Sequence, residues 1–202
     1  MATFTRNGYG QVEPNQLSAQ KTGQIYASLP LSSDVTVLQN GEFMYYDAAN
    51  GTVNADATVG EPMLVFNEIK LYEPFWQTSY KDFAMIRVGD NYVTSRLATA
   101  GYGDGATNTG ATIDPAHTEY GYRMDGIAPR LFKTNVGDLY TTNMVKTGVE
   151  YEVGDLLAPV KDTTSNTLVL EEAAGTTGML WQVVKVYTMP DGQPGLKLQR
   201  VQ

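Results

Sequence analysis

The sequence predicts an all-β fold, an antiparallel β-barrel or sandwich with little helix. Two observations indicate it. Gly, Thr, Asn and Tyr are plentiful and Val is frequent, a composition that favours strands and turns. The turn sequence Val-Gly-Asp-Leu occurs twice, at 136–139 and at 153–156, each time before residues that can enter a sheet. Glycine tolerates a positive φ, and the aspartate can accept hydrogen bonds from the turn's own N–H groups. A helical pattern is limited to about one turn near residues 16–20.

The first 34 residues differ from the rest and predict an extended N-terminal arm that is ordered by contact with something else. Glycines and prolines interrupt a Gln/Asn/Ser-rich segment with isolated apolar residues. A terminus without a role explains the same composition. If the arm binds a partner, we expect its apolar side chains to make the contact: Phe4, Tyr9, Val12, Leu17 and Tyr26.

Residues 35–202 form the predicted β-rich body, with 35–128 and 129–202 as candidate sub-parts. Asn40-Gly41 suits a two-residue turn and predicts a hairpin of 34–39 with 42–46, and Asn50-Gly51 predicts a second tight turn. Met63 to Tyr72, with a break near Asn67, and Phe83 to Val88 are further candidates. Strand character resumes at Pro129 to Tyr140. The clearest candidate strands lie in the C-terminal third, at Tyr151 to Val160, Thr167 to Leu170, Met179 to Tyr187 and Leu196 to Val201.

A long glycine-rich loop is predicted between Ala100 and Asp125, where no periodicity survives. Tyrosines set among its glycines, and the aromatic connection around Trp76, are candidate interface residues, because Tyr and Trp bury a large area and keep a polar group. Most phenylalanines and Trp181 are expected in the core. The candidate partner contacts outside the arm are Trp76, Tyr102, Tyr120 and Tyr122.

Composition and charge argue against several classes of binding partner and against a membrane-spanning or secreted protein. The 202 residues carry a formal charge of −8, and the 14 Lys and Arg residues form no run. Neither nucleic acid nor an anionic membrane surface is therefore an expected partner. No apolar stretch approaches the roughly 20 residues that cross a bilayer. No secretory signal is evident, so we expect the protein to be made, and to remain, on the cytosolic side of its producing cell.

Catalytic and metal-binding patterns are weak. Without cysteine, disulfides and thiolate metal sites are excluded. The single histidine, His117, has no nucleophile motif near it, and the Asp104-Gly105 region lacks the alternating acidic ligands of a calcium loop. We therefore expect no catalytic residue, cofactor or metal. Carboxylate chemistry such as glycoside hydrolysis is the one realistic enzymatic alternative.

The order of features in residues 130–202 resembles the head decoration (cement) proteins and related structural proteins of tailed bacteriophages. The resemblance rests on Tyr151-Glu152-Val153-Gly154-Asp155-Leu156, Leu180-Trp181-Gln182-Val183-Val184 and the segment from Met189 to Leu198, together with the polar N-terminal arm. It implies a non-enzymatic virion protein that binds the outer surface of the major capsid protein lattice and stabilises it. It also implies self-association as a trimer or another small oligomer. Two alternatives remain: a carbohydrate- or host-binding β module of a tail or fibre, and a tail or connector subunit.

Overall fold

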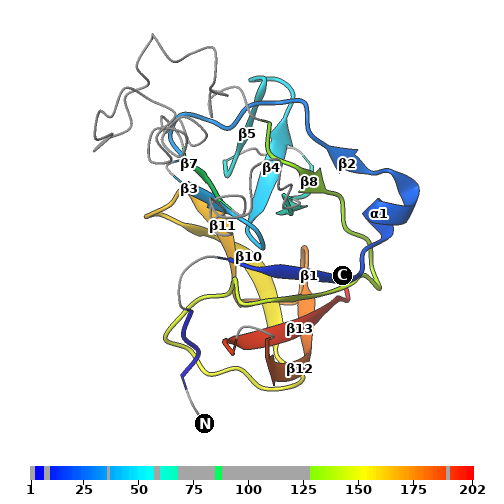
Figure 1. Cartoon of the computed structure of the whole chain (residues 1–202), viewed down its shortest axis with the longest axis vertical. Coiled ribbons are helices and arrows are strands. Elements are labelled where there is room, and N and C mark those ends of the chain that lie inside the picture. The colour runs from blue at the N-terminus through cyan, green and yellow to red at the C-terminus, as the bar shows by residue number, and fades with distance from the viewer. Residues whose placement is uncertain are drawn as a thin grey trace, which may run out of the picture.

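The computed structural model describes residues 3–6, 10–35, 37–56, 60–67, 85–87, 128–189 and 192–202. Strands dominate this part of the chain, and its one helix, α1, spans Ser18–Thr22 (Figure 1). The all-β, antiparallel prediction with little helix is confirmed. The strands are β1 (Val12–Gln16), β2 (Ile25–Tyr26), β3 (Val37–Gln39), β4 (Phe43–Asp47), β5 (Thr52–Asn54), β6 (Met63–Val65), β7 (Met85–Arg87), β8 (Leu131–Phe132), β9 (Leu139–Thr142), β10 (Leu156–Asp162), β11 (Thr167–Glu172), β12 (Trp181–Thr188) and β13 (Pro194–Arg200).

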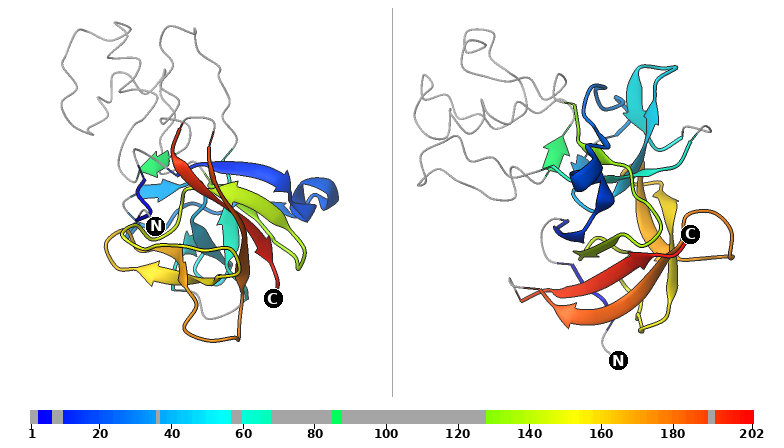
Figure 2. Two further views of the ribbon diagram at one scale, coloured as in Figure 1. Left: turned by 90° about the horizontal axis from the view of Figure 1, so that it is seen from below. Right: turned by 90° about the vertical axis from the view of Figure 1, so that its right-hand side faces the viewer.

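One antiparallel sheet contains nearly all of these strands, in the order β1-β9-β13-β12-β10-β11-β4-β6-β8-β2, with β5 paired to β4. It curls into a half-barrel, as the two views in Figure 2 show. Strands β3 and β7 form a separate pair. Strands from 35–128 and from 129–202 are therefore neighbours in one sheet, since β4 and β6 lie between β11 and β8.

The core fills the concave side of the half-barrel with aromatic rings. Trp181 and Tyr140 meet edge to face at 4.9 Å between ring centroids, and Phe43 lies 5.9 Å from Trp181. Phe132 is also fully buried, and Phe66 packs against it at 5.4 Å. The prediction that most phenylalanines and Trp181 fill the core is confirmed for these residues. Phe83 lies outside the described residues.

The N-terminal segment is built into the sheet at both of its ends. Strand β1 pairs with β9 at one end, and β2 pairs with β8 at the other. Phe4 is buried in the core, where its ring meets Tyr151, and its backbone exchanges hydrogen bonds with residues 148 and 149. The described part of residues 1–34 is thus ordered by contacts within its own chain, unlike the predicted arm. Its isolated apolar residues enter the core one at a time, and its backbone satisfies strand edges that would otherwise be open.

The predicted hairpin across Asn40-Gly41 is wrong. The turn is present, but β3 pairs with β7, whereas β4 pairs with β5, β6 and β11. The reason lies in the turn's other contacts. Gly41 N–H donates to the carbonyl of Val65, and the Asn40 side chain forms two hydrogen bonds with the backbone of Asn67. These contacts direct the chain away from a hairpin. The turn at Asn50-Gly51 does join a hairpin, β4–β5.

The two Val-Gly-Asp-Leu turns have the same hydrogen bonds. Gly137 and Gly154 have positive φ angles of 96° and 105°. Each glycine N–H donates to a carbonyl of the neighbouring strand, on β13 and β12 respectively. Each aspartate side chain accepts the N–H of the residue three positions earlier, at 2.9 Å for Asp138 and 2.7 Å for Asp155. The predicted role of the aspartates in closing these turns is confirmed.

Asp138 also caps α1 from a distant part of the sequence. The residue before the helix is Leu17, which offers no side-chain cap. The Asp138 carboxylate instead accepts hydrogen bonds from the Ser18 N–H at 3.0 Å and the Ser18 hydroxyl at 2.9 Å. One buried side chain therefore closes a turn and satisfies a helix N-terminus that is 120 positions away.

Replacing Asp138 by alanine is expected to lower the free energy of unfolding by about 2–3 kcal/mol, because three donors lose a buried, charged acceptor. The matched variant, Asp155→Ala, removes the same turn contact without a helix cap and is expected to cost about 1 kcal/mol. Urea denaturation followed by fluorescence measures both. Equal losses in the two variants would show that the cap does not contribute.

Candidate functional site

Glu42 is a buried acid at the start of β4, directly after the Asn40-Gly41 turn. Its side chain is 1% exposed. Oε2 accepts the backbone N–H of Gln39 at 2.6 Å, and Oε1 lies 3.0 Å from Oγ1 of Thr167 on β11. Buried carboxyl groups are uncommon in a β core, because burial penalises the charged form. Glu42 is therefore the first residue of the candidate site.

Two hydroxyl groups connect Glu42 to a second acid, Asp162, at the end of β10. The Thr167 hydroxyl lies 2.7 Å from the Ser165 hydroxyl, which in turn lies 3.0 Å from Oδ2 of Asp162. Thr167 is fully buried and Ser165 and Asp162 are half-buried, so the chain runs from the interior toward the surface.

This chain of four groups requires a proton on a carboxyl. Its three contacts need three hydrogens, whereas the hydroxyls of Ser165 and Thr167 supply two. If both carboxylates were ionised, one contact would join two lone pairs. A proton on either carboxyl removes the conflict: with Asp162 protonated the hydroxyl of Thr167 donates to Glu42, and with Glu42 protonated the hydroxyl of Ser165 donates to Asp162.

The environment of Glu42 favours the proton on that carboxyl. Burial raises the pKa of its carboxyl from the ordinary value of 4.5 to about 8, although the Gln39 N–H, the Thr167 hydroxyl and the charge of Arg6 act to lower it. The charge of Asp162 adds to the increase. Glu42 is therefore neutral at pH 7.

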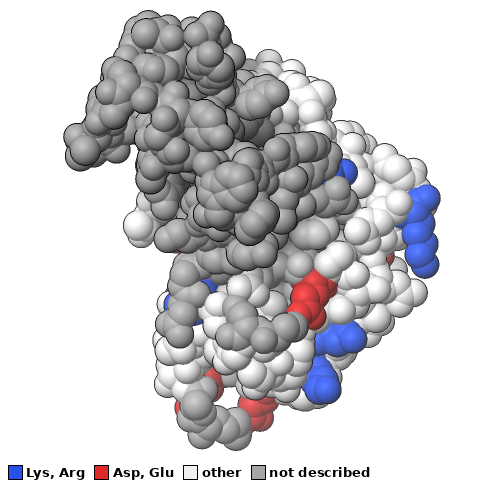
Figure 3. All heavy atoms as spheres, in the orientation of Figure 1, with Lys and Arg blue, Asp and Glu red and all other residues white. Residues whose placement is uncertain are grey.

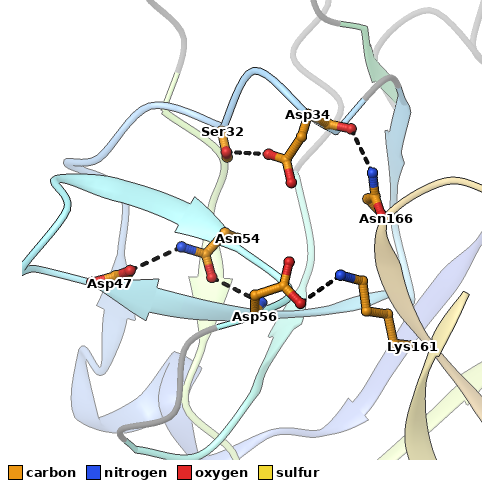
Figure 4. Close-up of polar contacts among 7 residues, drawn as sticks. All are labelled: Ser32, Asp34, Asp47, Asn54, Asp56, Lys161 and Asn166. Carbon is orange, nitrogen blue, oxygen red and sulfur yellow. Dashed lines mark hydrogen bonds and ion pairs between the residues drawn. The ribbon is translucent and has the colours of Figure 1, made fainter. Parts of the chain in front are cut away.

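A polar network holds the β10–β11 hairpin that carries Ser165 and Thr167 (Figure 4). Asn166, at a positive φ of 54°, donates to the carbonyl of Asp34 at 2.9 Å. Lys161 forms an ion pair with Asp56, whose N–H donates to the side chain of Asn54 at 3.0 Å. These contacts fix the hairpin against the strands next to Glu42.

Arg6 brings a positive charge to the same region from the N-terminal segment. It lines an open pocket of about 380 Å³ together with Lys146, Lys161, Asp162 and Glu171. Its guanidinium contacts the Met144 sulfur and, at 3.5 Å, the carbonyl of Val145. Burial lowers the pKa of Arg6, and the charges of Glu42 and Asp162 act to raise it. We refer to this cavity as the Arg6 pocket.

The four predicted partner-binding residues that the structure describes do not form a common surface. Phe4 and Leu17 are 4% and 2% exposed and belong to the core, and Val12 is half-buried on β1. Tyr26 is 37% exposed and packs on Tyr46, with ring centroids 5.2 Å apart. The remaining candidates, together with His117 and the predicted glycine-rich loop, lie outside the described residues: Tyr9, Trp76, Tyr102, Tyr120 and Tyr122.

The Glu42 chain and Arg6 were missed by sequence reasoning, which placed Glu42 on an ordinary strand. The signal that could have indicated it is an acid between a tight turn and the apolar run Phe43-Met44. Nothing local links it to its partner, because Glu42 and Thr167 are 125 positions apart.

Other possible sites give weaker indications. Within the described residues no group of three acidic or histidine side chains could hold a metal ion. None of the helical residues described here forms a segment long and apolar enough to span a membrane. On the face shown in Figure 3, the visible acidic and basic side chains lie in small, separate groups.

Comparison with known proteins identifies no relative. No family model, no curated protein and no solved structure matches this chain.

Proposed function

We propose that the protein is a non-enzymatic structural protein of a tailed-phage virion that binds the outer surface of the capsid and stabilises it. The resemblance of residues 130–202 to decoration proteins is the starting point. In the structure these residues supply strands β8 to β13, which form most of the half-barrel. The proposal places the protein on the assembled particle after synthesis in the host cytoplasm.

The aromatic pair of exposed Tyr26 and half-buried Tyr46 is the observation that carries this proposal. Tyr26 lies on the terminal strand β2, and the hydroxyl of Tyr46 is hydrogen-bonded to Ser28. A tyrosine pair of this kind offers a large contact area with little loss of side-chain entropy. We assign the pair to the contact with the major capsid protein. Binding the assembled lattice, and not the free subunit, would stabilise the particle by mass action.

Purified protein mixed with undecorated heads is expected to bind saturably and to raise their resistance to heat. Tyr26→Ala should weaken this binding at least about tenfold, the effect of losing one central aromatic contact. Val153→Thr is the matched control, because Val153 is an apolar residue that is 66% exposed in a turn. Absence of saturable binding by the unmodified protein would overturn the function. Unchanged binding by Tyr26→Ala would overturn the assigned surface.

A carbohydrate- or host-binding module is the second candidate, and the same aromatic pair supports it because tyrosine rings stack on sugars. Quenching of intrinsic fluorescence by a glycan would favour this candidate. Analytical ultracentrifugation separates the remaining cases: a trimer or another small oligomer fits a decoration protein, whereas large rings indicate a tail or connector subunit.

A further inference from the structure

No ion pair with another described residue compensates the charge of Arg6. Among the described residues no carboxylate lies within ion-pair distance of its guanidinium, whose contacts are a sulfur and a carbonyl oxygen. The acids whose charges act on it are Glu42 and Asp162. Burial raises the pKa of Glu42 to about 8, which favours its neutral form at pH 7. A half-buried arginine commonly pairs with an acid, and the described part of the chain offers Arg6 no such ion pair.

The other cations of the pocket are already paired, but weakly. Lys146 binds Glu171 at 2.6 Å, with side chains 52% and 23% exposed, and Lys161 binds Asp56 on the pocket's outer side. Exposed ion pairs of this kind contribute little, so an incoming anion can compete for either lysine. Asp162 and Glu171 also line the pocket and would repel a doubly charged ligand more than a singly charged one.

We propose that the Arg6 pocket binds a carboxylate group, held by the guanidinium of Arg6 and assisted by Lys146 and Lys161. The planar guanidinium of Arg6 carries parallel N–H donors that can bind both oxygens of a carboxylate. The pocket's volume of about 380 Å³ accommodates an acidic sugar or an acidic amino-acid side chain. The proposal does not depend on capsid binding, and its test uses the isolated protein.

Glu42 makes this site sensitive to pH. The charged and titratable groups around Glu42 are Arg6 from the N-terminal segment and Asp162 from β10; β11 contributes the Thr167 hydroxyl, and β3 contributes the Gln39 N–H. When Glu42 loses its proton, a negative charge arises beside Arg6. This charge compensates the guanidinium and repels a bound carboxylate. Affinity should therefore be highest below about pH 8 and fall above it.

Calorimetric titration of the full chain with glucuronate and with the side-chain acid N-acetylglutamate α-amide tests the proposal, with glucose and inorganic phosphate alongside. We expect millimolar or tighter binding of at least one carboxylate at pH 6.5, at least tenfold weaker binding at pH 9.5, and none of glucose. Preference for glucuronate identifies an acidic sugar as the source, and preference for the glutamate derivative identifies a protein side chain. Binding of neither, or tighter binding of phosphate, would overturn the proposal.

Three variants refine the test. Arg6→Gln should lose at least tenfold in affinity, whereas Lys21→Gln, which removes the same charge from exposed α1, should retain it. Glu42→Gln should keep the affinity of the unmodified protein at pH 6.5 and retain it at pH 9.5. If Arg6→Gln fails to fold, Lys161→Met is the substitute, with a loss of about threefold or more expected. Unaltered affinity in the Arg6 variant, or pH dependence that survives Glu42→Gln, would contradict the assignment.

Discussion

Replacing Glu42 by glutamine is expected to remove a loss of stability that the unmodified protein suffers between pH 5 and pH 8. The folded carboxyl has a pKa of about 8, whereas the unfolded chain titrates near 4.5. Between these values the folded state binds one more proton than the unfolded state, so the free energy of unfolding falls as pH rises. The slope approaches about 1 kcal/mol per pH unit, and the loss between pH 5 and pH 8 is on the order of 3 kcal/mol.

Glutamine at position 42 can keep the hydrogen bonds of Glu42, but its side chain does not titrate. Its amide can donate to Thr167 and accept from the Gln39 N–H, so the directed chain through Ser165 stays intact. Urea denaturation at pH 5, 6.5 and 8 should give a steeper pH dependence for the unmodified protein than for Glu42→Gln. Glu171→Gln, which neutralises a partly exposed acid of the pocket, should retain the steep dependence. Parallel slopes for the unmodified protein and Glu42→Gln would show that Glu42 is already ionised.

Substitution of Gly41 by alanine is expected to be strongly destabilising, because backbone strain and a steric clash add at this position. Its φ of +93° is unfavourable for any residue with a Cβ, and the added atom would lie 2.6 Å from both Cβ of Met144 and Oγ1 of Thr142. These two residues are buried, and the Thr142 hydroxyl is hydrogen-bonded to the Gln11 carbonyl at 2.6 Å. Strain and overpacking together should cost about 3–5 kcal/mol.

Gly137 provides a matched control for this effect. Its φ is +96°, almost the same, but nothing lies within 4 Å of an added Cβ. Gly137→Ala therefore measures backbone strain alone and should cost about 1–2 kcal/mol. Thermal or chemical denaturation of both variants separates strain from the steric term. Equal losses in the free energy of unfolding would mean that the core around Met144 and Thr142 rearranges around the added methyl group without a free-energy cost.

The sequence predicted the strands better than their partners. Strands β10 to β13 follow from alternation and turn residues, which are local properties. The Asn40-Gly41 turn shows where local rules stop, because the flanking strands pair elsewhere. That outcome depends on Val65 and Asn67, whose contacts with the turn cannot be inferred from the dipeptide. The N-terminal segment shows the same limit of local rules. Phe4 and Leu17 are isolated apolar residues in the sequence, and only the tertiary structure shows that they pack in the core.

The candidate site was still harder to predict. Arg6, Glu42 and the pair Asp162 and Thr167 come from three separate stretches of the chain, and no motif joins them. The serine, threonine and aspartate residues of 162–167 are as typical of an ordinary turn as of a functional site. What distinguishes this turn is the acid buried behind it, and burial of a glutamate follows from tertiary packing.

The closure of both sheet ends by the N-terminal segment has a consequence for how the chain folds. Gln11 bonds to Asn143 across 132 positions, and Ser18 bonds to Asp138 across 120. Contacts this distant in sequence slow folding, because a large loop must be ordered before they form. During synthesis, β1 and β2 leave the ribosome first, yet they must wait for β9 and β8 before they can pair. Strands β1 and β2 are thus made before their partners and are fixed among the last of the described elements.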